Sequence, residues 1–311
     1  MDTAIFYHMK KTHSNKRKPK TPLALRLLRL TYNTLGRVFP AYFGRRAYAL
    51  WFTTTRFKTP PYERPALAAA RNEQVSVNGL QIAVYLWQHE SIAPAATLLF
   101  IHGWTGRGSQ VASYIERLTG LGYRVISFDG PAHGNTPGKQ TSLLEMTDVI
   151  FALNKKYGDF DAAITHSFGG MILTFAMSLG LKVDRAALIC PPNNFQVILD
   201  NFQRILQLPD CVMQAMERIS YATHGQVIRD LVDMENNVRR LSCKSLLIHD
   251  EDDTDISWHS SEKIARAWPG ARFIKTQGLG HRRIVRDSQV VQHIIDFLDP
   301  IPPKDHPETA D

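Results

Sequence analysis

The sequence contains few cysteines, and these form no recognisable pattern. Only Cys190, Cys211 and Cys243 occur among 311 residues, far apart and without a Cys-x-x-Cys pair. This spacing suggests neither a disulfide framework nor a zinc site. We interpret the three side chains as reduced, mostly buried thiols, which favours a reducing compartment and a cytoplasmic location.

The N-terminal region also lacks a long uninterrupted apolar run. Its most apolar part, residues 22–40, is broken by Arg26, Arg29 and Arg37. It therefore offers neither the apolar core of a signal peptide nor the roughly 18 consecutive apolar residues that a membrane-spanning helix needs. We expect no membrane span in this region.

Acidic residues are almost absent from the first 60 positions, where thirteen lysines and arginines accompany a single acid, Asp2. This segment carries a charge of +12, which leaves −4 for the remainder of a chain whose formal net charge is +8. A basic arm on a mildly acidic body is not the charge pattern of a nucleic-acid groove, and no nucleic-acid-binding motif accompanies it. We expect no nucleic-acid partner.

Residues 22–40 nevertheless have the periodicity of a helix. At 3.6 residues per turn, polar and apolar side chains gather on different faces, which predicts a basic amphipathic helix. Such a helix could make peripheral contact with an anionic membrane surface, or dock on the protein body with its arginines in water. We prefer docking. The polar set is Arg26, Arg29, Asn33 and Arg37, and the apolar set is Leu27, Leu28, Leu35 and Val38.

Prolines mark the end of this arm. The run 59–65 contains Pro60, Pro61 and Pro65, which disfavour helix and strand alike and so indicate a linker. We place the domain boundary near residue 70. Residues 1–70 then form a basic arm with an amphipathic helix and a linker, and residues 71–311 form one α/β domain.

Short apolar runs alternate with helix-length segments beyond this boundary. From the third run onward, each pair of runs brackets a helix-sized piece, which predicts right-handed crossovers. The result is a mostly parallel, eight-stranded sheet covered by helices on both faces. Only residues 78–81 separate the first two runs, so these form an antiparallel hairpin at one edge. The expected strands are Glu73–Val77, Ile82–Trp87, Thr97–Ile101, Tyr123–Phe128, Asp161–Thr165, Arg185–Cys190, Ser245–His249 and Arg272–Thr276.

One interval, residues 191–241, is too long for a simple crossover. It has helical patterning in Phe195–Gln207 and in Val212–Tyr221, interrupted around Pro209. We predict a small helical cap inserted over the sheet at about residues 191–241.

Ser167 follows the fifth expected strand, in a segment of small residues. A nucleophile elbow turns so tightly that the positions two before and two after the nucleophile must be small. Gly169 meets this requirement, whereas Thr165 is bulkier than the glycine usual at its position. We predict that Ser167 is a nucleophile. The alternative is that it only caps the following helix.

A glycine-rich loop, residues 102–108, follows the third expected strand and should lie at the same edge of the sheet. Acyl transfer needs two backbone N–H groups directed at the developing oxyanion. We assign these two donors to Trp104 and to Phe168, the residue after Ser167. The alternative is an ordinary glycine turn.

A histidine follows the eighth expected strand in a second glycine-containing loop. There, Gly278 and Gly280 precede His281. A flexible loop after the last strand can bring an imidazole to the edge that carries Ser167. We predict that His281 is the general base; the alternative is an ordinary surface histidine.

The carboxylate that orients this base should follow the seventh strand, where four aspartates occur within residues 250–255. The order serine, acid, histidine matches the order of a known triad. Asp253 lies one short loop beyond the strand and is the preferred residue, with Asp250 as the alternative. The Asp-x-Asp-x-Asp-Gly spacing of a calcium loop is missing, so we expect no metal.

Together these motifs resemble the α/β-hydrolase family, over roughly residues 73–299. The resemblance implies an α/β-hydrolase fold and a cofactor-free, esterase- or lipase-like enzyme with a cap that shapes substrate entry. It also implies a structural or pocket-lining part for His133, a part we extend to His102, Gly103 and His166. The matching segments are 102–104, 128–135, 166–170, Asp253 and Gly280-His281.

The expected reaction is hydrolysis of a small-molecule carboxylic ester through an acyl-enzyme on Ser167. A thioesterase or lysophospholipase would use the same triad. A second hypothesis is a non-catalytic scaffold that binds a ligand or a partner, although an intact triad speaks against it. The sequence does not define the acyl chain, the alcohol or the oligomeric state.

Overall fold

The computed structural model describes residues 22–91, 93–224 and 232–299. The first 21 residues of the basic arm, seven residues of the expected cap and the last twelve residues lie outside these ranges.

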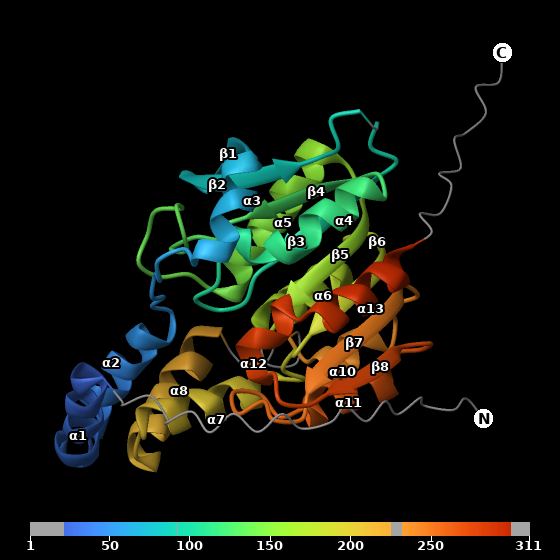
Figure 1. Ribbon diagram of the computed structural model, residues 1–311. Coiled ribbons are helices and arrows are strands. Elements are labelled where there is room, and N and C mark those ends of the chain that lie inside the picture. The colour runs from blue at the N-terminus through green and yellow to red at the C-terminus, as the bar shows by residue number, and fades with distance from the viewer. Residues whose placement is uncertain (1–21, 92, 225–231, 300–311) are drawn as a thin grey trace.

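An eight-stranded sheet forms the centre of the protein, with the strand order β1-β2-β4-β3-β5-β6-β7-β8 (Figure 1). The strands β1 and β2 form an antiparallel hairpin at one edge, β2 also pairs antiparallel with β4, and all other pairs are parallel. The predicted sheet is confirmed, and no strand boundary differs by more than two residues. The strands are β1 Arg71–Val77, β2 Leu80–Trp87, β3 Ala96–Ile101, β4 Tyr123–Phe128, β5 Phe160–His166, β6 Val183–Ile189, β7 Lys244–Asp250 and β8 Arg272–Thr276.

Strand β3 illustrates why helices cover both faces of the sheet. Its consecutive side chains alternate between the faces, and Leu98, Leu99, Phe100 and Ile101 are all fully buried. Leu98 and Phe100 belong to one hydrophobic cluster, and Leu99 and Ile101 belong to the other. The helices on the Leu99 side are α5 Leu143–Tyr157, α6 Phe168–Ser178, α10 Met234–Val238 and α11 His259–Ala267; those on the Leu98 side are α4 Ile115–Gly120 and α13 Ser288–Leu298.

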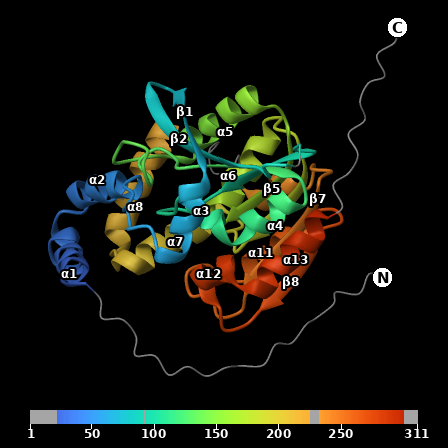
Figure 2. The same cartoon turned by 45° about the horizontal axis from the view of Figure 1, so that its top comes forward.

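Two helices follow β6 where the cap is expected. They are α7 (Phe195–Leu206) and α8 (Asp210–His224), separated by Gln207–Pro209. The arm forms α1 (Leu23–Val38) and a second helix, α2 (Pro40–Trp51), which begins at a proline that suits the first helical position. Figures 1 and 2 show α1 and α2 beside α7 and α8, with α1 at the outer end of the molecule. None of the described helices is long and apolar enough to cross a bilayer.

The docked face of α1 differs from the predicted one. Tyr32 and Gly36 are buried against the cap, whereas Leu27 and Val38, assigned to the docking face, are 55% and 66% exposed. The guanidinium of Arg29, expected in water, donates to the carbonyl of Ile205 at 2.9 and 2.7 Å. Leu28 of the predicted apolar set does pack on the cap, but the docked face is centred on Tyr32 and Gly36. Hydropathy did not indicate this face, because the close approach depends on the missing side chain of a glycine. A Cβ at position 36 would lie 3.1 Å from a Val212 methyl group.

The proline-rich run also differs from its prediction. It forms the short 3-10 helix η1 (Pro61–Glu63) and the helix α3 (Arg64–Ala69). Prolines are tolerated there because the first turn of a helix has N–H groups without helical partners. The buried Glu63 accepts a 2.6 Å hydrogen bond from Ser109, which ties the run to the sheet domain. The division of the chain at residue 70 stays a prediction.

Close packing of α2 on α8 predicts a large effect of substitution at Gly44. A Cβ at this position would lie 2.6 Å from the Cβ of Ala215, too close for any real pair. Overpacking of this kind costs about 1–3 kcal/mol. We expect Gly44→Val to lower the melting temperature by roughly 3–9 °C. Gly120→Val, where a Cβ meets nothing within 4 Å, is the matched control, and equal melting temperatures of the two variants would contradict the packing.

Candidate active site

Ser167 occupies a strained turn between β5 and α6. Its backbone has φ 53° and ψ −120°, a conformation that a residue with a side chain rarely adopts. This is the backbone of a tight strand-to-helix turn, and it leaves the side chain partly exposed at the end of a buried strand.

Neighbouring glycines make this turn possible. A Cβ at Gly169 would collide with the carbonyl oxygen of Ile101, and one at Gly103 would lie 3.1 Å from the Cβ of Ser167. Thr165, bulkier than the usual glycine, is accommodated in the strand with 0% exposure. Gly170 provides part of the space for Thr165. A Cβ added at position 170 would lie 3.3 Å from the Thr165 hydroxyl oxygen, so a larger residue there would crowd it.

The loop after β7 brings Asp253 to His281. The Nδ1 atom of His281 lies 2.6 Å from Oδ2 of Asp253, whose side chain has no exposed surface. The other oxygen, Oδ1, accepts the backbone N–H groups of Asp255 at 2.8 Å and Ile256 at 2.9 Å. Both oxygens of this buried carboxylate are therefore hydrogen-bonded.

Opposing effects determine the charge of Asp253. Burial raises the pKa of this carboxyl, but the hydrogen bonds from His249, His281 and the N–H of Ile256, with the charge of His281, lower it well below its usual range. The side chain is therefore ionised at neutral pH. Nδ1 of His281 then carries its proton, and Nε2 is left free to accept one.

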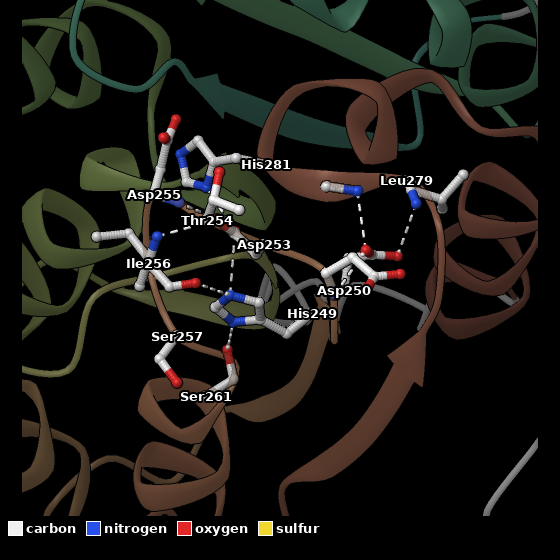
Figure 3. Close-up of polar contacts among 12 residues, drawn as sticks. His249, Asp250, Asp253, Thr254, Asp255, Ile256, Ser257, Ser261, Leu279 and His281 are labelled. Atoms are coloured by element: carbon white, nitrogen blue, oxygen red, sulfur yellow. Dashed lines mark hydrogen bonds and ion pairs between the residues drawn. The ribbon is translucent and has the colours of Figure 1, made fainter. Parts of the chain in front are cut away.

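His249, which the sequence analysis did not single out, contacts the same carboxylate from the opposite side (Figure 3). Its Nε2 lies 3.2 Å from Oδ2 of Asp253 and 3.0 Å from the carbonyl of Ile256, so Nε2 carries the proton. Its Nδ1 accepts from the hydroxyl of Ser261 at 2.7 Å. The sequence feature that could have indicated this role is the position of His249 at the end of β7, directly before the aspartates.

Asp250, the alternative acid, is fully buried and has a different set of partners (Figure 3). Its two oxygens accept the backbone N–H groups of Gly280 at 2.8 Å and Leu279 at 3.1 Å, and the hydroxyl of Thr276 at 2.8 Å. Asp250 thus holds the loop that carries His281, whereas the His281 ring itself is hydrogen-bonded to Asp253.

The ring of His281 lies close to the turn at Ser167. His281 belongs to α12 (Gly280–Arg283), and its ring centroid is 4.9 Å from that of His166, the residue before Ser167. The Nε2–H of His166 donates to the carbonyl of His281 at 2.8 Å. Within the described ranges, no hydrogen bond joins the Ser167 hydroxyl to His281. Such bonds are often long in ligand-free enzymes and shorten when substrate binds.

The predicted oxyanion donors lie on the two loops that meet at this turn. The rings of Trp104 and Phe168 pack edge to face with centroids 5.5 Å apart. The loop of Trp104 closes through a 2.9 Å hydrogen bond from Gly106 to Gly103. Among the described residues, no acceptor takes the N–H of Trp104 or of Phe168. These groups are therefore available to a bound anion.

Two neutral histidines support the loop of Trp104. His102 accepts from the N–H of Gly130 at 3.0 Å, and His133 accepts from the N–H of Thr105 at 3.1 Å. Burial lowers the pKa of His102 to about 4; burial and the neighbouring His102 lower that of His133 to about 3. Both rings therefore stay uncharged and link the loop after β3 to the loop after β4.

A thiol lies next to the acid and the histidine. The Cys190 sulfur and donor atoms of Asp253 and His281 all lie within 4.8 Å of one another, a set that could hold a metal ion. Burial, reinforced by the charge of Asp253, raises the pKa of the Cys190 thiol well above its ordinary value. A metal needs the thiolate, so the protonated thiol disfavours metal binding in the present arrangement.

Comparison with models of known protein families gives a match over most of the sheet domain. The model of the Alpha/beta hydrolase family matches residues 98–292, which include Ser167, Asp253 and His281. No curated protein matches the sequence.

Several solved structures are similar to this chain. They include an esterase from Pyrococcus furiosus (16% identity, TM-score 0.57, covering 79% of this chain and 95% of that one). An enol-lactonase from Burkholderia xenovorans has 18% identity and a TM-score of 0.56 over 73% of this chain and 99% of its own. A bacterial membrane phospholipase A has 20% identity and a TM-score of 0.58 over 90% of this chain and 97% of its own. At these identities the likeness shows the fold.

The buried histidines predict how stability depends on pH. Burial lowers the pKa of His166 to about 3, as it lowers those of His102 and His133. An unfolded histidine binds its proton near pH 6.5, so the unfolded chain takes up protons first. We expect the free energy of unfolding to fall as the pH drops from about 6.5 to about 4.

The measurement is urea unfolding across this pH range. His133→Gln should reduce the slope of the free energy of unfolding against pH by the equivalent of about one proton. The substituted chain has one imidazole fewer to protonate on unfolding. His259→Gln, at a side chain that is 58% exposed, is the matched control for the loss of one imidazole outside the buried set. Equal slopes for His133→Gln and the parent would show that His133 is not neutral in the folded protein.

Proposed function

The chain belongs to the alpha/beta hydrolase family, and on that premise we propose that it is a serine hydrolase that cleaves carboxylic esters. Ser167 is the proposed nucleophile, His281 the general base and Asp253 the orienting acid. The main support is the 2.6 Å contact between His281 Nδ1 and Asp253, beside the strained turn at Ser167.

The first proposed step forms an acyl-enzyme. Nε2 of His281 removes the hydroxyl proton of Ser167 as Oγ attacks the ester carbonyl, and the new oxyanion accepts the N–H groups of Trp104 and Phe168. When the tetrahedral intermediate collapses, the carbon–oxygen bond to the alcohol breaks. His281 then gives its proton to the leaving alkoxide, so the alcohol departs neutral.

The second proposed step releases the acid. His281 removes a proton from a water molecule, whose oxygen attacks the acyl carbon within the same oxyanion site. Collapse of this second intermediate returns the proton to Oγ of Ser167 and frees the carboxylic acid. Every proton moves through His281, so the chemistry needs no cofactor.

Asp253 is proposed to act on His281 alone. Its charge holds the proton on Nδ1 and stabilises the imidazolium that forms in each step. His249 is a positioning residue, because its N–H, 3.2 Å from Oδ2, helps to keep this buried carboxylate ionised and correctly directed.

The proposed partner is a small-molecule ester, and residues 191–241 would form the cap that shapes its entry. We also propose a cytoplasmic location, on the three unpaired cysteines, with peripheral membrane contact through residues 22–40. The similar structures include an esterase, an enol-lactonase and a phospholipase A, and those activities belong to those proteins. A panel of p-nitrophenyl esters of rising chain length tests ester cleavage and defines the acyl part.

Ser167→Ala should abolish hydrolysis of these esters while the protein still folds. The substitution removes one partly exposed oxygen and little volume, so the melting temperature should stay within about 1–2 °C. A fluorophosphonate probe should label the parent and not the variant. Parental kcat in Ser167→Ala would show that another residue is the nucleophile.

Asp253→Asn and Asp250→Asn should have different principal effects. Asp253→Asn removes the charge that holds the imidazole tautomer, a loss worth about 10⁴ in kcat in a comparable triad. Asp250→Asn would instead place an amide against the N–H groups of Leu279 and Gly280, so it should mainly lower the melting temperature. If kcat fell more in Asp250→Asn than in Asp253→Asn, Asp250 would replace Asp253 as the proposed acid.

A further inference from the structure

One face of α1 is apolar and yet points to solvent. Leu23, Leu27, Leu30 and Val38 are 68%, 55%, 60% and 66% exposed. With the exposed Thr34 they recur at intervals of three and four residues and so lie on one side of the helix. We call these five residues the outer stripe.

The opposite face of α1 accounts for the docking on the cap. Tyr32 and Gly36 are buried there, and Leu25 and Leu28 pack into a cluster that also contains Val212 of α8. The outer stripe therefore makes no contribution to this contact. Figures 1 and 2 show α1 at the outer end of the molecule, with no described element beyond it. An exposed apolar stripe on a docked helix commonly marks a binding surface.

Positive charge borders the outer stripe. Arg26 and Arg37 are exposed along one edge of it, and residues 22–60 contain no aspartate or glutamate. The surface therefore combines apolar side chains with an excess of cations.

An open groove of about 420 Å³ lies on the arginine side of α1. Leu30 of the outer stripe also lines this groove, so the two features are continuous. Arg29 uses Nε and Nη2 on the carbonyl of Ile205, which fixes its guanidinium at the groove wall. A fixed guanidinium beside the exposed Arg26 suits the oxygens of a phosphate group. The groove is lined by Arg26, Arg29, Leu30, Asn33 and Gln207.

We propose that α1 binds the surface of an anionic phospholipid bilayer. The outer stripe enters the boundary between headgroups and acyl chains, while Arg26 and Arg37 stay at headgroup level, as on an amphipathic helix lying in a membrane interface. The groove beside Leu30 takes a lipid phosphate. Because α1 packs on α7 and α8, the bound protein holds its cap next to the bilayer.

A second copy of the chain fits this surface less well. A symmetric contact of two outer stripes would bring Arg26 and Arg37 of one copy towards the same residues of the other. No acidic residue within 22–60 is present to compensate this repulsion. An anionic membrane satisfies both the apolar and the cationic part of the surface.

The test is co-sedimentation of the full chain with vesicles of phosphatidylcholine, with and without phosphatidylglycerol. We expect binding to the anionic vesicles that weakens steeply as salt is raised, since exposed charges are screened over about 10 Å at 0.1 M salt. Ser167→Ala should bind like the parent, because the proposed binding is independent of the proposed catalysis.

A double substitution in the outer stripe tests the apolar contribution to binding. Leu27→Gln with Leu30→Gln should weaken the partition coefficient at least tenfold, since both leucines are expected to enter the bilayer boundary. Leu144→Gln with Leu179→Gln, at side chains that are 43% and 54% exposed elsewhere, is the control and should bind normally. Both leucine pairs should keep the melting temperature and the soluble-ester turnover of the parent.

The cationic part is tested by Arg26→Gln with Arg37→Gln. We expect a loss of about thirtyfold on anionic vesicles, from the usual contribution of two basic residues at such a surface. Arg239→Gln with Arg240→Gln changes the net charge equally at exposed positions outside α1 and should bind like the parent. Three results would overturn the proposal: no binding at low salt, equal losses in test and control pairs, or a dimer that dissociates on substitution of Leu27 and Leu30.

Discussion

The buried carboxylate of Asp253 can keep its charge only because hydrogen-bond donors surround it. A charge removed from water is costly unless each lone pair finds a donor. Here two backbone N–H groups of the following turn hold one oxygen, and the rings of His249 and His281 approach the other. The loop after β7 must therefore keep its tight shape. The proton on Nδ1 of His281, and with it the basic Nε2, depends on this arrangement.

A second constraint comes from the crowding around Ser167. Its positive φ is unfavourable for a residue with a side chain and persists only where the surroundings leave no alternative. Glycines at positions 103 and 169 let the loop after β3 pack directly on the turn. Two neutral histidines, His102 and His133, then hold that loop against the loop after β4 through hydrogen bonds that they accept from backbone N–H groups. The strained backbone, the proposed oxyanion donors and the proposed base are thus brought together by contacts among three loops at one edge of the sheet.

The arm extends the protein beyond this common architecture. Its two helices pack on the cap, through two close approaches at Gly36 and Gly44. The packing uses one face of α1 and leaves a second apolar face in solvent. If α1 binds a membrane as proposed, its basic edge and second apolar face would hold the cap against that surface. The arm and the proposed catalytic residues would then act together, with substrate entry placed at the membrane interface.

The sequence by itself determined the positions of the strands, which of them run parallel or antiparallel, and the turn at Ser167. These features depend on the local pattern of apolar and polar residues and on small residues close together in the chain. It also narrowed the proposed acid to the four aspartates within residues 250–255, with Asp253 preferred and Asp250 as the alternative. Only the tertiary structure placed Asp253, rather than Asp250, against His281, and placed His249 against the same carboxylate. It also decided which face of α1 packs on the cap. These outcomes depend on which segments, distant in sequence, can approach closely. How closely two segments can approach depends on the volumes of their side chains and on whether buried donors and acceptors find partners. A local sequence pattern contains neither kind of information.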